Sequence, residues 1–150
     1  MSSSTDIAKL RSQTGAGVMD CKKALEEAND DFEKAKAILA SNADAIAKKK
    51  SERATKSGLI EVYSHGGRIG VMIEVNCESD FVGKNDDFKL MVHNLCLQIA
   101  SMQAKTVEEL LAQEYILDSS LKVADYVNSL IGKIRENIQI KRFVRYELGE

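Results

Sequence analysis

The sequence predicts an α+β protein in which a three-helix unit, residues 1–50, precedes a small core, residues 51–150, with a three-stranded antiparallel sheet covered by helices. In the first unit, apolar residues recur at three- and four-residue steps, as they do on one side of an amphipathic helix. In residues 59–77 and 137–148, apolar and polar residues alternate, which is typical of half-buried strands. Strands with one apolar face need a cover, and two helical stripes between the alternating runs supply it.

The N-terminal unit is expected to contain three short helices separated by turn residues. Thr5 can cap the first helix, and Thr14-Gly15-Ala16-Gly17 ends it, because two glycines permit backbone angles that other residues avoid. A second helix is expected to begin near Asp20, and Asp31 can cap the third. The apolar positions of the three helices are Ile7, Leu10, Cys21, Ala24, Leu25, Ala28, Phe32, Ala35, Ile38 and Leu39. This core is thin, so we expect the unit to lean on the rest of the chain.

Residues 43–56 are rich in alanine and cations and are interpreted as a solvated helical connector. The alternative is a basic patch for RNA, carried by Lys48-Lys49-Lys50. No aromatic residue is interleaved there for base stacking, and the net charge of the chain is −2. The sequence therefore favours the connector and predicts no nucleic-acid partner.

The core is expected to begin with a β-hairpin. Alternating residues 59–64 and 68–77 flank His65-Gly66-Gly67, and Gly-Gly between alternating runs is a hairpin signal. A helix follows, because residues 88–99 carry a single apolar stripe. Strand and helix are therefore joined by a short turn near residue 80.

That turn lies in the segment from Glu74 to Lys84, and it places an acidic residue, Asp80, beside an aromatic one, Phe81. Both residues fall outside the apolar set of the strand and outside the stripe of the helix. A fold gains little from an aromatic side chain at the tip of a strand. We therefore interpret the pair as a surface offered to a partner.

The C-terminal part is predicted to supply a second covering helix and the third strand. Asp118 or Ser119 can cap the helix, after a polar stretch in residues 103–113. The last run, residues 137–148, alternates again. Its apolar face is expected to contain Ile138, Ile140, Val144, Tyr146 and Leu148, opposite Lys141, Phe143, Arg145 and Glu147.

No combination of residues in the sequence indicates catalysis. His65 and His93 have no nucleophile arranged near them, and Gly15-Ala16-Gly17 is too short for a phosphate-binding fingerprint. His93 and Cys96, with Cys77, could ligate a metal, but Cys96 lies on the apolar stripe and the usual ligand spacing is missing, so core packing is favoured. We therefore predict no enzymatic activity, no cofactor and no metal.

Composition and cysteine usage predict a cytoplasmic protein. The residues are 44% hydrophobic and 29% charged, as in globular chains, and no apolar run approaches the length that crosses a bilayer. The N-terminus has no cationic region followed by an apolar segment, so no secretion signal is expected. Three cysteines, an odd number without CxxC spacing, fit reduced and buried thiols.

Three motifs, in order, resemble those of bacterial elongation factor Ts in its short form. The first is residues 10–11 with 14–25, the second is 74–84, and the third is 133–138 with 142–149. The resemblance covers nearly the whole chain. It implies an N-terminal domain of three helices like the ubiquitin-associated domain, followed by an α+β exchange-factor core.

The resemblance also implies a function, that of a guanine-nucleotide exchange factor that associates with elongation factor Tu bound to GDP and promotes exchange for GTP. The loop Ser79-Asp80-Phe81-Val82 would enter the GTPase and dislodge its magnesium ion. The family's other contacts with the GTPase are carried over to Arg11, Gly17, Val18, Met19, Lys22 and Asn76. The resemblance to the short form also leaves open a homodimer that forms through the core. The alternative function is a protein-binding module without exchange activity.

The chain departs from the family pattern at several places. Ser79 stands where threonine is usual, Arg135 where glycine is usual, and Lys141 where arginine is usual. The stretch between Ala100 and Asp118 is much shorter than in typical members, and the second core repeat of the long forms is absent. Contacts that those parts make in the family are left open here.

Overall fold

Three helices form the N-terminal unit in the computed structural model, which describes residues 2–150: α1 (Ser4–Thr14), α2 (Val18–Glu27) and α3 (Phe32–Lys50). The cap of α1 is Ser3 and not Thr5, because the Ser3 hydroxyl accepts the amide of Asp6. Helix α2 begins at Val18, slightly before the predicted start. Asp31 caps α3 as predicted, since its carboxylate accepts the amide of Lys34.

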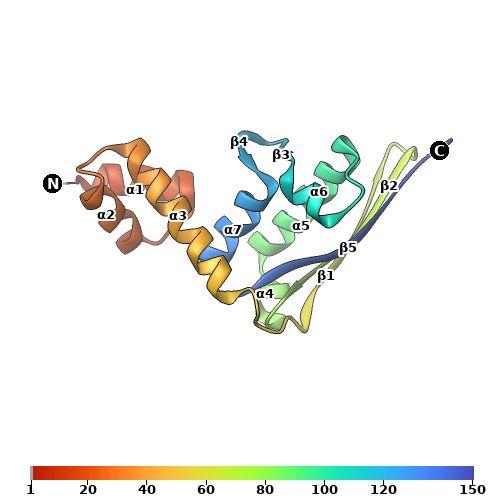
Figure 1. The fold of residues 1–150 in the computed structure, drawn as a ribbon, viewed down its shortest axis with the longest axis horizontal. Coiled ribbons are helices and arrows are strands. Elements are labelled where there is room, and N and C mark those ends of the chain that lie inside the picture. The colour runs from red at the N-terminus through yellow and green to blue at the C-terminus, as the bar shows by residue number, and fades with distance from the viewer. Residues whose placement is uncertain (1) are drawn as a thin grey trace.

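Helix α3 is longer than expected and runs from the N-terminal unit to the core (Figure 1). The interpretation of residues 43–56 as a solvated connector is therefore wrong in part, because Ala47 is buried in the core cluster and Ile46 packs against it. Lys48 and Lys49 are exposed at the end of α3, where cations interact favourably with the helix dipole.

The predicted three-stranded antiparallel sheet is confirmed, with β1 (Ser57–His65), β2 (Ile69–Cys77) and β5 (Ile138–Glu147) in the order β1-β2-β5. Gly66 and Gly67 form the hairpin turn between β1 and β2, with φ angles of 59° and 69°. Positive φ at both central positions is typical of the tight turn that matches strand twist, and glycine adopts it at low cost.

The predicted alternation of the last strand is wrong beyond Ile140. Val75 of β2 pairs with Ile140 and Glu74 pairs with Arg142, so Lys141 is an extra residue in a β-bulge. One extra residue reverses which side chains face the core. The sequence pattern carries no sign of this insertion.

After the bulge, the two faces of β5 are exchanged relative to the prediction. Phe143 packs against the core, and the side chain of Arg145 is only 9% exposed. Val144 and Tyr146, expected to be buried, are 39% and 76% exposed. Together with Ile60, Val62 and Met72 they form the outer sheet face, which is apolar and exposed.

Three helices cover the other face of the sheet: α5 (Asp86–Met102), α6 (Val107–Ala112) and α7 (Val123–Ile134) (Figure 1). The predicted stripe of α5 is confirmed, since its members are all buried: Phe88, Met91, Val92, Leu95, Cys96 and Ile99. The predicted cap of α7 is wrong, because residues 118–122 form β4 (Asp118–Lys122), which pairs with β3 (Glu114–Tyr115). The helix begins at Val123.

The buried residues fall into two clusters. The smaller lies among α1, α2 and α3 and contains Leu10, Cys21, Ala24, Leu25, Ala28, Ala35 and Leu39. The larger lies between the sheet and its covering helices and includes Ala47 from the end of α3. Division of the chain at residue 50 stays a prediction. Within residues 2–150, none of the helices has the length and hydropathy needed to span a membrane.

Candidate functional site

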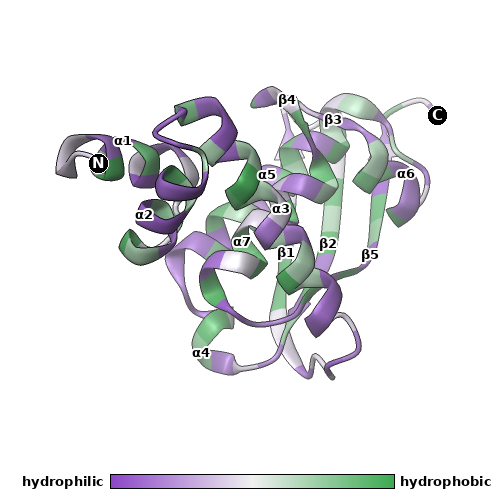
Figure 2. Ribbon diagram, turned by 60° about the vertical axis from the view of Figure 1, so that its left-hand side comes forward, coloured by the Kyte–Doolittle hydropathy of each residue, from purple (hydrophilic) through white to green (hydrophobic). Residues whose placement is uncertain are grey.

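The turn that sequence analysis singled out forms α4 (Asp80–Gly83), a single helical turn at the end of the sheet far from the C-terminus (Figures 1 and 2). Phe81 is 84% exposed, and Asp80 beside it is exposed as well. Val82 is only 4% exposed and packs in the larger core cluster. The turn is thus anchored by Val82 and presents Asp80 and Phe81 to solvent.

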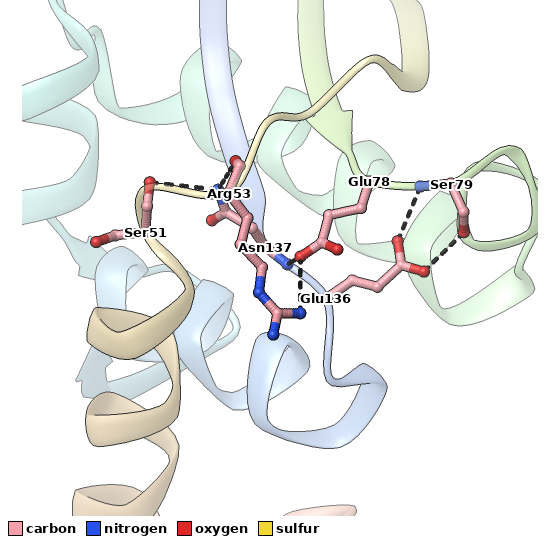
Figure 3. A network of polar contacts seen from close by, with 6 residues as sticks. All are labelled: Ser51, Arg53, Glu78, Ser79, Glu136 and Asn137. Carbon is pink, nitrogen blue, oxygen red and sulfur yellow. Dashed lines mark hydrogen bonds and ion pairs between the residues drawn. The ribbon is translucent and has the colours of Figure 1, made fainter.

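Ser79 and Glu136 hold α4 in place across 57 residues of sequence (Figure 3). The Glu136 carboxylate accepts two hydrogen bonds, one from the Ser79 amide at 3.0 Å and one from the Ser79 hydroxyl at 2.7 Å. The hydroxyl oxygen in turn accepts the amide of Val82 at 3.3 Å, as an N-cap does. We call this pair the Ser79–Glu136 clamp. It fixes the direction in which α4 presents its exposed residues.

A second set of polar contacts ties the clamp to the end of α3 (Figure 3). The Glu78 carboxylate accepts a hydrogen bond from the backbone amide of Asn137 at 2.7 Å and lies 3.6 Å from the guanidinium of Arg53. The side-chain amide of Asn137, which is 2% exposed, donates to the carbonyls of Arg53 at 2.8 Å and Ser51 at 3.4 Å. Three loops distant in sequence are therefore joined at the base of α4.

The thiol of Cys77 also supports the turn. It donates a hydrogen bond to the Ser79 carbonyl at 3.2 Å. Burial, and next the negative charge of Glu136, raise the pKa of Cys77 to about 11. A thiol with so high a pKa is protonated and unreactive near neutral pH, so Cys77 acts as a hydrogen-bond donor.

The N-terminal residues expected to contact a partner are exposed around the start of α2. Val18 and Met19 are 48% and 60% exposed, and Gly17 is the N-cap of α2. Arg11 lies in the last turn of α1, and Lys22 pairs with Glu26 at 3.9 Å. Arg11 and Val18 line one open hollow of about 650 Å³, with Ile7 and Lys133 among its other walls. An apolar floor with cations at its rim suits a partner surface that combines apolar and acidic groups.

The last expected contact, Asn76, lies near the end of β2, opposite Gly58 of β1 and Gln139 of β5. It is half-buried and close in sequence to α4. Both ribbon views show α4 apart from α1 and α2 (Figures 1 and 2). The expected contacts therefore form two separate surfaces: one on the N-terminal unit and one around α4.

The histidine and cysteine considered as metal ligands have other neighbours. Cys96 is fully buried in the larger core cluster, where burial raises its pKa to about 12. His93 Nδ1 lies 3.5 Å from a carboxylate oxygen of Glu61, and its ring meets that of Tyr63 edge-on. Over residues 2–150, no group of three or more potential ligands gathers to hold a metal ion. Core packing, the interpretation favoured from sequence, accounts for the position of Cys96.

Glu136, Asn137, Glu78 and Arg53 belong to the site but were not singled out as site residues from the sequence. A signal existed for three of them, because Glu78 lies in the motif of residues 74–84, and Glu136 and Asn137 lie in the motif of residues 133–138. The structure shows what these positions do, since the two motifs meet at the clamp.

Removing the Glu136 carboxylate is expected to loosen α4. The Glu136→Ala variant leaves the Ser79 amide and hydroxyl without their acceptor in a partly buried place, which costs about 1–3 kcal/mol of unfolding free energy. Thermal or urea unfolding measures the loss. The matched control is Glu108→Ala, at an exposed glutamate of α6, which should stay within about 0.5 kcal/mol of the parent chain. Equal stability of both variants would contradict the role of the clamp.

Comparison with known proteins finds extensive similarity. Residues 78–150 match the sequence family described as Elongation factor TS. A relative named Elongation factor Ts from Thermotoga maritima is 42% identical over 188 aligned positions, covering 96% of this chain and 94% of the relative. One from Thermoanaerobacter pseudethanolicus is 40% identical over 196 positions, covering 100% and 96%. One from a Nostoc species is 48% identical over 145 positions, covering 96% of this chain but 46% of the relative.

Proposed function

We propose that this chain, which belongs to the elongation factor Ts family, is a guanine-nucleotide exchange factor for elongation factor Tu. It acts in translation elongation. It associates with the GTPase in its GDP-bound form and promotes release of GDP, so that GTP can bind. The chain makes and breaks no covalent bond in this process, and it needs no cofactor of its own.

One observation carries the proposal, the exposure of Phe81 on a firmly held turn. An aromatic side chain that is 84% exposed contributes little to the stability of its own chain. The Ser79–Glu136 clamp and the buried Val82 nevertheless hold α4 in a single orientation. A preorganised apolar group loses little conformational freedom when it enters a partner, so its burial contributes more fully to binding.

The mechanism follows from the charge balance at a GTPase nucleotide site. There, a magnesium ion bridges the nucleotide phosphates and the protein and carries much of the local positive charge. Insertion of Asp80 and Phe81 would displace this ion and weaken the binding of GDP. The coupling is reciprocal, since the exchange factor lowers nucleotide affinity by the same factor by which nucleotide lowers affinity for it. Abundant GTP can therefore bind and expel the factor.

The second contact surface of the proposal is the N-terminal unit. Val18 and Met19 would supply apolar contact, while Arg11 and Lys22 would supply charge at the rim; Gly17 lets the backbone approach closely. Asn76 would add a polar contact beside α4. Two linked surfaces bind more tightly than either alone, provided that their spacing matches the partner.

The test is the release of a fluorescent GDP analogue from elongation factor Tu. We expect substoichiometric amounts of this chain to accelerate release, because the factor is expelled by GTP and can act again. A chain that binds the GTPase but leaves the release rate unchanged at saturating concentration would instead be a protein-binding module without exchange activity.

The proposal places the chain in the cytoplasm, where elongation takes place, and assigns it a protein partner and no nucleic acid. It also includes a homodimer, in which the outer sheet faces of two copies meet. Five apolar side chains on this face are 39–76% exposed, and a contiguous apolar patch marks a site of association. Arg142 of β5 is already paired with Glu74 of the neighbouring strand at 2.9 Å. Such a patch can pack on its own copy about a twofold axis.

A lysine in the middle of the outer sheet face is expected to prevent dimerisation. The Val62→Lys variant should sediment as a folded monomer at concentrations where the parent chain sediments as a dimer, because Val62 is 66% exposed in the single chain and a lysine there would be buried only in the dimer. The control is Leu117→Lys at another exposed apolar side chain, which should leave the dimer intact. A parent chain that stays monomeric up to about 0.1 mM, well above the Kd of typical specific complexes, would contradict the dimer.

A further inference from the structure

Helices α3 and α7 approach each other closely at Gly132. A Cβ atom added at Gly132 would lie 3.0 Å from the Cβ of Ala43 and 3.2 Å from its Cα. The backbone of Gly132 does not adopt a positive φ angle, so conformational freedom is not the reason for glycine here. The absence of a side chain instead lets the two helix backbones come together, as small residues do at close helix crossings.

Further contacts join α7 to the N-terminal part of the chain around this crossing. The side-chain amide of Asn128 donates to Asp44 of α3 at 3.0 Å. The guanidinium of Arg135, which follows α7, donates to Asp20 of α2 at 3.4 Å. Arg135 adopts a φ of 67°, a conformation in which glycine is usual, and its side chain reaches the N-terminal unit from there. These contacts give the N-terminal unit one orientation on the core.

The same helix leads directly to the clamp. Glu136, two residues after the end of α7, binds Ser79 at the base of α4. Helix α7 therefore connects two surfaces that lie apart: Val18 and Met19 on the N-terminal unit, and Asp80 and Phe81 on α4. Any change in the angle between α3 and α7 moves one surface relative to the other.

We propose that Gly132 is a positioning residue, whose missing side chain sets the angle between α3 and α7 and hence the spacing of the two surfaces that grip the GTPase. This inference rests on the proposed function. A bivalent contact gains affinity only when both surfaces reach the partner together. A larger residue at position 132 separates the helices and leaves the chain to bind through α4 alone.

The test compares affinities for elongation factor Tu bound to GDP, measured by titration calorimetry. We expect Gly132→Leu to weaken binding at least ~10-fold, within the range that linkage of two contacts contributes. The matched control is Ser129→Leu, which adds the same side chain on the exposed side of α7 and should bind as the parent chain does. Met19→Ala should weaken the binding of the GTPase by the parent chain. It should have little further effect on the affinity of the Gly132→Leu variant, because the contact through the N-terminal unit is already lost there. Additive effects of the two substitutions would overturn the inference.

A smaller substitution at position 132 separates a steric effect on the helix angle from general destabilisation. Gly132→Ala should weaken binding less than Gly132→Leu does, and adding Ala43→Gly should restore part of the loss, since it removes the nearer of the two steric contacts. A merely destabilising substitution would not be rescued by a second glycine in α3, because glycine itself weakens a helix. Failure of the double variant to bind better than Gly132→Ala alone would overturn the inference.

A distance measurement separates this inference from the proposed function. Spin labels on Lys23→Cys and Glu108→Cys, both exposed, report the spacing of the N-terminal unit and the core by pulsed electron resonance, and the native cysteines are buried. We expect Gly132→Leu to shift or broaden the distance distribution and Ser129→Leu to leave it unchanged. An unchanged distribution in Gly132→Leu would overturn the inference. Absence of any binding by the parent chain would contradict the proposed function, and the distances would still decide the role of Gly132.

Discussion

Phe81→Ala is expected to reduce the acceleration of GDP release by about 10–100-fold, the effect of removing a central aromatic anchor from an interface. The melting temperature of the free chain should stay the same, because the Phe81 ring is 84% exposed and contributes little burial. Asp80→Ala should behave in the same way, since Asp80 is exposed on the same turn. Exchange assays and melting curves on the same preparations measure both effects.

The matched control for Phe81, which lies in α4, is a phenylalanine of the next helix, α5. Phe88 is fully buried in the core cluster, so Phe88→Ala should lower the free energy of unfolding by about 3–5 kcal/mol through lost burial and a residual cavity. The two phenylalanines thus separate a role in binding from a role in folding. A marked fall in the melting temperature of Phe81→Ala, with normal exchange by the protein that remains folded, would contradict the assignment of Phe81 as the inserting side chain.

Gly58→Ala is expected to cause one of the largest losses of stability in the chain. Gly58 has a φ of 146°, and a Cβ there would lie 2.2 Å from the Val75 carbonyl oxygen and 2.8 Å from the Cα of Asn76, both in the backbone of the paired strand. Backbone strain of about 1–3 kcal/mol adds to an overpacking cost of about 1–3 kcal/mol. Since each kcal/mol corresponds to about 2–4 °C for a chain of this size, the melting temperature should fall by several degrees.

The expected loss at Gly58 depends on its surroundings and not on the exchange of glycine for alanine as such. Gly70 has open space around the position of a Cβ and no positive φ, so Gly70→Ala should stay within about 0.5 kcal/mol of the parent chain. Gly58 also lies against α4, because a Cβ on Gly83 would be 3.3 Å from the Gly58 carbonyl oxygen. We therefore expect Gly58→Ala to impair exchange as well. Full stability of this variant would contradict the close approach of β1 and β2 at Gly58.

Much of the fold could be predicted because local patterns report local structure. The Gly66-Gly67 turn, the buried stripe of α5 and the cap at Asp31 follow from residues close together in sequence, and the structure confirms them. Errors occurred where a tertiary contact outweighs the local pattern. Residues 118–122 can cap a helix, but in the fold they pair with β3, and α7 begins only at Val123.

The candidate site, too, contains residues that local pattern indicates and contacts that it does not. Phe81 could be singled out because it belongs to neither neighbouring apolar pattern, and the structure places its ring in solvent. The contact between Ser79 and Glu136 could not be predicted, because the two residues are 57 positions apart and neither motif indicates which residue of the other it meets. Hydrogen bonds of this kind depend on where the chain brings two loops together.

The sequence by itself determined the fold class, the three strands of the main sheet with the stripe of α5, and the exposed position of Asp80 and Phe81, since hydrophobic periodicity and turn residues act over a few positions. Only the tertiary structure decided which face of β5 is buried beyond Lys141, since a bulge depends on pairing with β2. It also decided that Gly132 lies against Ala43 and that Glu136 holds the base of α4. These contacts join segments far apart in sequence, and their free energy depends on atomic distances that no local pattern records.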